Sequence, residues 1–371
     1  MNILITGGEG FIAKNLSLKL RENGHQNIST VNRKTNTNEL KQKILSSDFI
    51  FHLAGENRPK IDSDFEKGNV NYTEKILKFI SASRKEIPIV FSSSSQAILD
   101  NPYGRSKLKA ESRLIEFSKE NKSPVHIFRL DNVFGKWSKP NYNSFISTFC
   151  YNVIRGLPIK VNDTSELITL VYIDDVCDAF IAILNKRKKD IFHKVKPTYK
   201  KKVADVAKLI NKFNLNQKNF TIESVGRGFE RKLYSTFLSY YPVERFSYPL
   251  KENIDTRGVF AEVLKTDKNG QFSFFTAKPG ITRGGHYHHT KNEKFLVLSG
   301  HALFKFENLE TNEKYAMEIG PEQYKVVETV PGWTHDITNI GDCELIVMLW
   351  ANEQFNPQKP DTISKPLEWE V

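Results

Sequence analysis

The sequence contains few cysteines and no long apolar run, and both absences restrict what the protein can be. The three cysteines among its 371 residues are far apart and match no metal-binding or redox spacing; they are Cys150, Cys177 and Cys343. Unpaired thiols of this kind suit a reducing cytosol. No apolar stretch reaches the roughly 18 residues of a membrane helix, and the opening residues Met1–Ile5 lack the basic region of a signal peptide. We therefore expect a cytoplasmic protein that binds no membrane.

Acidic residues are outnumbered by basic ones, which gives the chain a formal net charge of +11. Such a charge is compatible with binding nucleic acid, an acidic surface or a phosphorylated small molecule. The basic runs Lys186–Lys189 and Lys200–Lys202 have no aromatic residues between their charges, and runs of this kind are most often solvated helix ends or loops. We therefore expect no nucleic-acid partner and interpret the charge as favourable to phosphate-rich ligands.

The length of the chain fits two domains, and its first 180 residues alternate short β-rich runs with longer amphipathic stretches. Strands are expected at Asn2–Thr6, Ile28–Asn32, Phe49–Leu53, Ile89–Ser92 and Val125–Arg129. Helices are expected between them, notably at Phe11–Glu22, Ser63–Arg84 and Tyr103–Asn121. This alternation predicts an α/β fold, a Rossmann-like doubly wound parallel sheet with crossover helices.

The pattern changes near residue 245, where helices give way to short strands separated by Gly, Asn and Pro turns. The expected strands are Gln271–Ala277, Glu293–Ser299, Ala302–Glu307, Lys325–Thr329 and Glu344–Trp350. Regular short strands without intervening helices are typical of an antiparallel sandwich or barrel. We place the boundary at 244–249, with the α/β domain over residues 1–243 and an all-β barrel over residues 250–371.

A glycine-rich turn lies between the first expected strand and the first expected helix. It reads Gly7-Gly8-Glu9-Gly10-Phe11-Ile12-Ala13. Glycines permit a tight turn and let the backbone approach a pyrophosphate, and the helix that follows offers N–H donors and a partial positive charge. We therefore expect Gly7, Gly10, Phe11 and Ile12 to bind a dinucleotide. The alternative is an ordinary strand–helix turn.

The second expected strand ends in Asn32-Arg33-Lys34, without an acidic residue. An NAD site needs an acidic residue here for the adenosine ribose hydroxyls, whereas an arginine accommodates a 2′-phosphate. Arg33 therefore predicts a preference for NADP(H). The alternative is an exposed basic turn.

A serine run and a Tyr-x-x-x-Lys pair follow one another at the fourth expected strand and the helix after it. Tyr103 and Lys107 are four residues apart and so share one face of that helix. We expect the Lys107 ammonium to lower the pKa of Tyr103, which makes this side chain a proton donor or acceptor near neutral pH. Ser94, at the end of the strand, is expected to hydrogen-bond the substrate oxygen.

Histidines and one glutamate form a second candidate site in the all-β region. His286 and His288 are two apart and point to one face of a strand, Glu293 begins the next strand, and His335 comes from a distant one. Three imidazoles and a carboxylate can bind a divalent zinc, iron, manganese or nickel ion with one position left open. The alternative is a histidine-rich loop that holds no metal.

The motifs of residues 1–180 together resemble those of the extended short-chain dehydrogenase/reductase family, which acts on sugar nucleotides. The resemblance includes Leu53-Ala54-Gly55, Asn132-Val133-Phe134-Gly135 and Val171-Tyr172-Ile173-Asp174-Asp175. The resemblance implies that Leu53-Ala54-Gly55 contacts the cofactor. It also implies that Ser94 and Tyr103 contact the reacting carbonyl. Lys107 is implied to hold the nicotinamide ribose, so Tyr103 and Lys107 border the cofactor as well.

One departure from that family narrows the expected chemistry. Its 4,6-dehydratases carry an Asp-Glu pair directly after the serine or threonine, for acid–base elimination of water. Here the two positions are Ser95 and Gln96, so we expect carbonyl reduction or 4-epimerisation and no dehydration.

The segment from Gly280 to Gly300 is similar to the cupin signature, G-x5-HxH-x4-E-x6-G, without a gap. Segments 255–262 and 283–286 also resemble deoxysugar 3,5-epimerases, in which the residue at the His286 position is the proton-abstracting base and no metal is bound. The complete ligand set here favours His286 as a ligand. The proton-abstracting residue then stays unassigned, with three neighbours as candidates: Tyr287, His289 and Lys291.

Over nearly the whole chain, the combination resembles the bifunctional reductase–cupin enzymes of bacterial capsular polysaccharide synthesis, on the path to UDP-N-acetyl-L-fucosamine. The resemblance implies a UDP-linked 4-keto-6-deoxy-N-acetylhexosamine substrate, C3 epimerisation at a zinc cupin, and NADPH reduction at C4 to UDP-2-acetamido-2,6-dideoxy-L-talose. It also implies a homodimer. Two alternatives stay open: a 4-keto-sugar reductase whose cupin is structural, and a sugar-nucleotide sensor without activity.

Overall fold

The computed structural model describes residues 1–83, 85–161, 165, 167–184 and 190–370. The last residue of the expected helix Ser63–Arg84 and the basic run Lys186–Lys189 therefore lie outside the described residues. The chain divides into two units, the first comprising Met1–Asn211 and Gly226–Tyr241 and the second Lys212–Val225 and Pro242–Val371. Among the described residues, no helix is both long and apolar enough to span a membrane.

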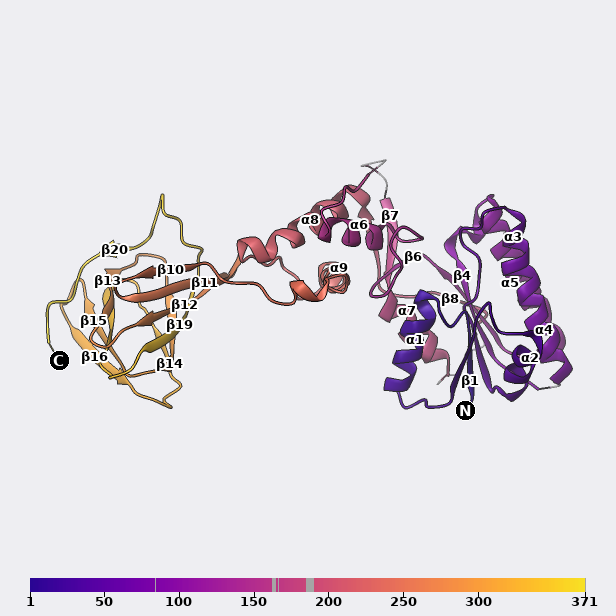
Figure 1. The fold of residues 1–371 in the computed structure, drawn as a ribbon, viewed down its shortest axis with the longest axis horizontal. Coiled ribbons are helices and arrows are strands. Elements are labelled where there is room, and N and C mark those ends of the chain that lie inside the picture. Colours follow the sequence, from indigo (N-terminus) through magenta and orange to yellow (C-terminus); the bar gives the residue numbers. More distant parts are fainter. Residues whose placement is uncertain (84, 162–164, 166, 185–189, 371) are drawn as a thin grey trace. The chain divides into compact units, whose positions relative to one another are not determined.

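The first unit is built on a six-stranded parallel sheet (Figure 1) in the order β2-β1-β3-β4-β5-β8. Its strands are β1 (Ile3–Thr6), β2 (Ile28–Val31), β3 (Phe49–His52), β4 (Ile89–Ser94), β5 (Val125–Leu130) and β8 (Phe192–His193). The sheet is wound in both directions from β1, which places the carboxyl ends of its strands at one edge, where dinucleotides bind in such folds.

Helices cover both faces of this sheet (Figure 1), because its strands are apolar on both sides. They are α1 (Phe11–Glu22), α2 (Thr37–Ser46), α3 (Ser63–Phe65), the π-helix η1 (Glu66–Asn71), α4 (Tyr72–Ser83), α5 (Pro102–Asn121) and α7 (Ile173–Leu184). Leu4, Ile50 and Phe91 face α2, α4 and α5, whereas Phe51 and Phe128 meet Phe180 of α7 on the other face. The alternation follows from the two-residue period of a strand.

A second, three-stranded sheet extends the first unit. Its order is β6-β7-β9, with β6 (Asn132–Phe134), β7 (Leu167–Tyr172) and β9 (Thr198–Lys202). The remaining elements are the 3₁₀ turn η2 (Ser95–Ile98), α6 (Phe145–Ile154), α8 (Val203–Asn219) and α9 (Gly228–Leu238). The basic run Lys200–Lys202 forms part of strand β9, where Lys201 pairs with Glu230, so it is not the loop or helix end that the sequence predicts.

The second unit consists of two antiparallel sheets that pack face to face (Figure 1). The first contains β10 (Glu252–Asp255), β11 (Gly258–Thr266), β12 (Gly270–Ala277), β19 (Leu345–Ala351), β14 (Glu293–Ser299) and β17 (Val326–Glu328). The second contains β16 (Lys314–Ile319), β15 (Ala302–Asn308), β18 (Trp333–Asn339), β13 (Thr282–Tyr287) and β20 (Ile363–Ser364). Phe275 and Phe295 of the first sheet and Phe304 of the second fill the space between them. The predicted fold class, a Rossmann-like parallel sheet followed by an all-β domain, is confirmed.

The division between the units differs from the expected single boundary at 244–249. Segment Lys212–Val225, which begins in the middle of α8, groups with the second unit. Arg245, in the short helix η3 (Val243–Arg245), donates to Gln217 and Asn214. Lys265 of β11 exchanges backbone hydrogen bonds with the residues on both sides of Thr221. These long-range bonds cannot be read from local sequence pattern.

Candidate active and metal-binding sites

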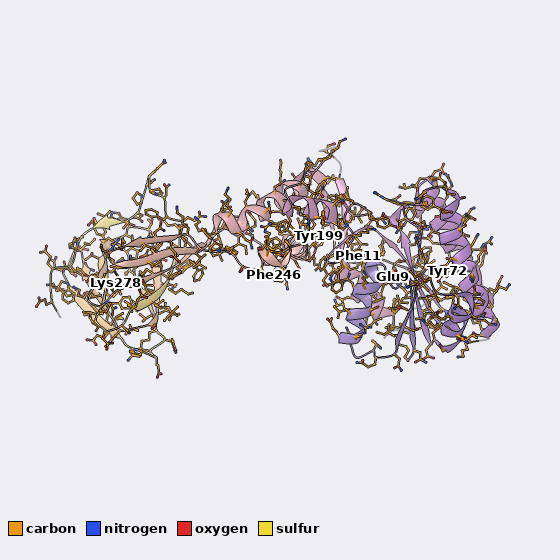
Figure 2. All side chains as sticks on the ribbon, viewed as in Figure 1. Glu9, Phe11, Tyr72, Tyr199, Phe246 and Lys278 are labelled. Carbon is orange, nitrogen blue, oxygen red and sulfur yellow. The ribbon has the colours of Figure 1, made fainter. Side chains whose placement is uncertain are left out.

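The glycine-rich turn between β1 and α1, marked by Glu9 and Phe11 in Figure 2, has the geometry of an anion-binding turn. Gly7 has φ +71°, and a Cβ there would lie 2.9 Å from the Ala54 Cα, so only glycine fits. The Gly10 amide donates to the Gly7 carbonyl over 2.7 Å. Helix α1 begins at Phe11 without a side-chain cap, which leaves its first N–H groups to a ligand.

Arg33 follows β2, as expected, and its guanidinium is engaged by an acidic partner. It lies 2.6 Å from Glu56 Oε2, while four-fifths of the Arg33 side chain remains exposed. The side-chain amide of the neighbouring Asn32 donates to the Glu9 carboxylate over 2.8 Å. The ion pair fixes Arg33 beside the glycine-rich turn, and its exposure leaves donors for a further anion.

The segment Leu53–Gly55 is held close to this turn by Thr6 at the end of β1. The backbone amides of Leu53 and Ala54 both donate to the Thr6 hydroxyl, over 3.1 and 3.0 Å. A Cβ added at Gly55 would lie 3.1 Å from Lys107 Nζ. The structure therefore brings the expected cofactor segment and Lys107 together.

Ser94 and Tyr103 also meet at the carboxyl edge of the sheet. Burial raises the pKa of Tyr103 to about 12, and the hydrogen bond from Ser94 lowers it by less. Lys107 is buried in α5 and donates to the Ser92 carbonyl over 3.0 Å. Burial lowers the pKa of Lys107 to about 8, with Glu111 opposing that change.

The expected influence of Lys107 on Tyr103 is wrong for this structure. The pKa of Tyr103 moves upward, because burial disfavours the tyrosinate and Tyr142 adds to that effect. The ammonium of Lys107 is turned toward the β4 backbone. Tyr103 is therefore protonated throughout the neutral range, which is the form that donates a proton.

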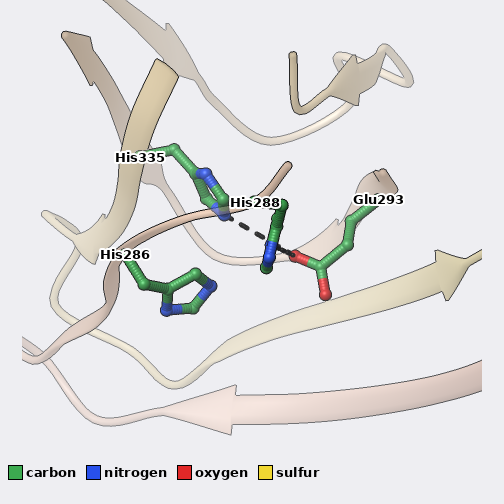
Figure 3. A group of neighbouring side chains, drawn as sticks. All are labelled: His286, His288, Glu293 and His335. Atoms are coloured by element: carbon green, nitrogen blue, oxygen red, sulfur yellow. Dashed lines mark hydrogen bonds and ion pairs between the residues drawn. The ribbon is translucent and has the colours of Figure 1, made fainter. Parts of the chain in front are cut away.

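The second unit brings the four predicted metal ligands into one cluster (Figure 3). Ligand atoms from His286, His288, Glu293 and His335 all lie within 4.8 Å of one another. Glu293 Oε2 is 3.4 Å from His288 Nε2 and 3.6 Å from His335 Nε2. Such mutual distances suit ligands arranged around a single ion.

The donor set fits a divalent metal on an observation independent of the motif. His335 is 3% exposed. Among the described residues neither of its ring nitrogens has a hydrogen-bond partner within 3.5 Å, and its Nε2 approaches Glu293 at the longer distance of 3.6 Å. A buried polar atom without a partner is costly. Burial lowers the pKa of His286 to about 4, aided by His335, so the imidazole is neutral, as a ligand must be.

Burial alone would raise the pKa of the Glu293 carboxyl group, but its neighbours His288, His335 and Lys291 hold it well below its usual range. Lys291 Nζ is 2.8 Å from Glu293 Oε1. Of the three candidates for a proton-abstracting residue, Lys291 contacts the cluster through Glu293, whereas His289 is exposed. The carboxylate is thus ionised and available to a metal.

Two glycines shape the strand that carries His286. Between Gly284 and His286 the pairing of β13 with β18 shifts register, and both Gly284 and Gly285 have positive φ, +99° and +74°. Bulges of this kind re-aim side chains next to functional sites. The shift places His286 directly opposite His335, with ring centroids 4.7 Å apart.

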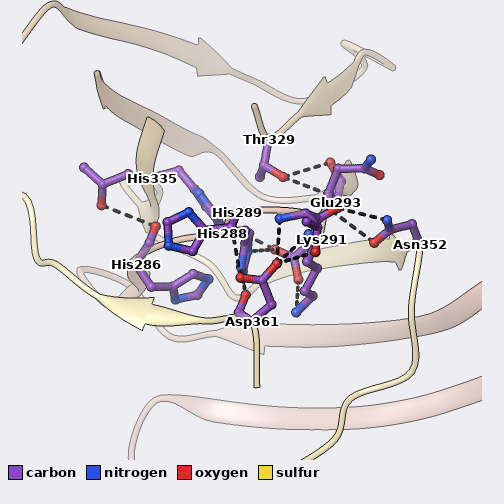
Figure 4. A network of polar contacts seen from close by, with 12 residues as sticks. His286, His288, His289, Lys291, Glu293, Thr329, His335, Asn352 and Asp361 are labelled. Carbon is purple, nitrogen blue, oxygen red and sulfur yellow. Dashed lines mark hydrogen bonds and ion pairs between the residues drawn. The ribbon is translucent and has the colours of Figure 1, made fainter. Parts of the chain in front are cut away.

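Asp361 is a residue of this site that the sequence analysis missed (Figure 4). Its carbonyl oxygen lies 2.5 Å from His288 Nδ1, and its carboxylate accepts from the backbone amides of His289, Thr290 and Lys291. These amides lower the pKa of Asp361 below its usual range. No motif spacing links position 361 to position 288, so the sequence carries no signal for this contact.

The model of the NAD dependent epimerase/dehydratase family matches residues 3–194. The chain belongs to this family. Residues 253–363 match a second model, the polysaccharide biosynthesis C-terminal domain. Family membership implies a nicotinamide dinucleotide for the first unit, and the resemblance stated from the motifs of residues 1–180 is confirmed.

Relatives of nearly equal length share both units. The chain is 47% identical to the UDP-2-acetamido-2,6-beta-L-arabino-hexul-4-ose reductase of Pseudomonas aeruginosa, over 98% of each chain. Among solved structures it resembles the capsular polysaccharide assembling protein CapF from Staphylococcus aureus, with 42% identity and a TM-score of 0.92 over 99% of this chain and all of that one. A UDP-glucose 4-epimerase of Thermus thermophilus, 16% identical with a TM-score of 0.54, covers 65% of this chain and 99% of that one and shares the fold alone.

Proposed function

We propose that the protein reduces the C4 ketone of a UDP-linked 2-acetamido-2,6-dideoxy-4-hexulose with NADPH, after inverting C3 of the same sugar at a metal centre in the second unit. The product would be UDP-2-acetamido-2,6-dideoxy-L-talose, a precursor for capsular polysaccharide. The observation that carries the proposal is the meeting of Ser94, Tyr103 and Lys107 beside the glycine-rich turn. The substrate is taken from the name of the Pseudomonas aeruginosa relative.

The proposed reduction requires hydride from the nicotinamide and a proton from the protein. Tyr103 holds that proton at neutral pH, because its pKa is about 12. Ser94 hydrogen-bonds Tyr103 and would orient the substrate oxygen toward the phenol. Lys107, whose ammonium lies next to Gly55, would hold the nicotinamide ribose. NADPH is proposed over NADH because Arg33 occupies the place of the ribose-binding acid.

The order of the two reactions follows from the chemistry of the sugar. The C3 proton is acidic only while C4 is a ketone, because the ketone oxygen accepts the charge of the carbanion. An arabino-configured 4-hexulose and an L-talose differ in configuration at C3, so inversion must precede reduction. A divalent ion held by His286, His288, Glu293 and His335 would supply a Lewis acid for the ketone oxygen; zinc is the metal we propose.

Proton NMR of the 4-keto sugar nucleotide in D2O, with enzyme and without NADPH, tests both activities. We expect the C3 proton signal to disappear with the wild-type enzyme and with Tyr103→Phe, but not with His335→Ala. Addition of NADPH should then give reduced sugar with wild-type enzyme only. Normal product from His335→Ala would contradict the proposed epimerase.

The ion pair between Glu293 and Lys291 favours a second candidate function. The two buried charges compensate each other, and such a site would also suit a metal that only stabilises the fold. In that case the protein is a 4-keto-sugar reductase alone. The two functions differ in one outcome: a structural site predicts NADPH consumption without any C3 exchange in D2O.

A further inference from the structure

The segment 361–369, which we call the strap, lies along every histidine-bearing segment of the metal cluster. Ser364 pairs with His286 in the ladder between β20 and β13. The carbonyl of Lys365 accepts from the hydroxyl of Thr334, the residue before His335, over 2.8 Å. The strap reaches the third histidine, His288, through Asp361.

Asp361 joins the strap to the loop between His288 and Glu293 (Figure 4). Its Oδ1 accepts from the His289 amide over 3.0 Å, and its Oδ2 accepts from the amides of Thr290 and Lys291 over 2.6 and 2.8 Å. The Thr290 hydroxyl donates to Oδ2 over 2.8 Å, which makes four hydrogen bonds to the carboxylate. Three consecutive residues after His288 are therefore held by one carboxylate.

The same residue fixes the tautomer of His288. A carbonyl oxygen only accepts hydrogen bonds, so the 2.5 Å contact with Asp361 requires that His288 Nδ1 carry the hydrogen. The other ring nitrogen, Nε2, faces Glu293, 3.4 Å away. Metal-binding histidines are commonly oriented in this way by a partner on the second nitrogen.

We propose that Asp361 is a positioning residue of the metal centre: its carboxylate clamps the loop 289–291 so that its own carbonyl holds His288 with Nε2 directed at the metal. This inference rests on the proposed function, because it presupposes that the cluster binds a divalent ion. It adds a residue from the strap, which contributes no ligand atom to the cluster.

The hydrogen bonds of Asp361 explain why its side chain affects His288, although it is the Asp361 backbone carbonyl that contacts the imidazole. Asp361 is joined to the loop by four hydrogen bonds to its carboxylate and only one to its backbone. In Asp361→Asn one oxygen becomes an amide nitrogen, which would face backbone N–H donors and repel them. The carbonyl would then lose its fixed position opposite His288.

The test is the affinity of the full-length, metal-free protein for Zn²⁺, measured by competition with a chromophoric chelator. We expect Asp361→Asn to bind Zn²⁺ about 10- to 100-fold more weakly than the wild type, the usual loss for an outer partner of a ligand. The matched control is Asp342→Asn, which removes the same charge from an exposed turn before β19 and should bind like the wild type. The visible spectrum of bound Co²⁺ should change for Asp361→Asn alone.

The outcomes separate this inference from the function on which it rests. Unchanged Zn²⁺ affinity and Co²⁺ spectrum in Asp361→Asn, with binding lost in His335→Ala, would overturn the role of Asp361 and leave the metal centre standing. Absence of Zn²⁺ binding by the wild type would contradict the metal centre itself.

A second variant tests the same contact if Asp361→Asn does not fold, as judged by its far-UV circular dichroism; this variant is Thr290→Val. That variant loses one of the four bonds, and we expect about fivefold weaker binding, against no change if the clamp is irrelevant.

Discussion

The two candidate sites differ in how far apart in the sequence their residues lie and in whether the protein alone satisfies them. Ser94, Tyr103 and Lys107 come from β4 and the helix that follows it, and each of them has a hydrogen-bond partner within the first unit. The metal cluster draws on β13, the loop after it, β14 and β18, and the buried nitrogens of His335 form no hydrogen bond within 3.5 Å among the described residues.

In the first site the protein supplies hydrogen-bond partners for its own polar side chains, whereas in the second a bound ion would satisfy buried nitrogens that form no hydrogen bond. In the first site, each substitution should change the reductase activity by an amount that depends on the role of the residue replaced. A site of the second kind should gain order and stability on binding its metal. The following predictions are designed to separate the two.

Tyr103→Phe should have the largest effect on the first site alone. The variant lacks the proton donor but keeps the aromatic ring, which packs against Phe65. We expect NADPH oxidation with the 4-keto sugar nucleotide to slow by about 100- to 10,000-fold, with Zn²⁺ affinity unchanged. Absorbance at 340 nm measures the rate, and a rate within tenfold of the wild type would exclude Tyr103 as the proton donor.

Arg33→Ala should have a smaller effect, confined to one cofactor. Loss of a charge-assisted bond to the 2′-phosphate would raise the KM for NADPH by about 10- to 100-fold, while the KM for NADH stays constant. Glu56→Gln is the matched control, because it frees the Arg33 guanidinium without removing it. Equal losses for both cofactors in Arg33→Ala would instead indicate a structural role for the Arg33–Glu56 pair.

The pH dependence of the reductase should show the smallest change. The pKa of Lys107 is lowered to about 8, so its ammonium is charged below that pH and neutral above it. Because this charge would hold the nicotinamide ribose, we expect kcat/KM to fall about tenfold for each pH unit above 8. Lys107→Arg keeps the charge and should remove this dependence, though at a lower rate. Exchange of the C3 proton at the metal site should not show this fall above pH 8. If kcat/KM of the wild-type reductase stayed constant up to pH 9.5, the role given to Lys107 would be contradicted.

The sequence was most informative where chemistry is encoded locally. The strand–turn–helix around Gly7 and the four-residue spacing of Tyr103 and Lys107 depend on neighbours in the chain, so their placement followed from periodicity and turn chemistry. His286 and His288 do lie together in the cluster, but His288 follows the end of β13, so the shared strand face that the sequence predicts is not what brings them together.

What escaped prediction depends on contacts between distant segments. The contact of Asp361 with His288 and the pairing of Arg33 with Glu56 have no motif. The direction of the pKa change at Tyr103 depended on burial and on where the Lys107 ammonium points. Neither is visible in a four-residue spacing.

The grouping of Lys212–Val225 with the second unit has a consequence for dissecting this protein. The chain passes from one unit to the other after Asn211, returns after Val225, and leaves again after Tyr241. A cut at any single peptide bond therefore cannot release two intact halves. A fragment starting at Pro242 would lack Gln217, the partner of Arg245, and one ending at Tyr241 would carry an orphaned stretch of the other half. The two units are interleaved along the chain, so a simple truncation meant to remove one of them would damage both.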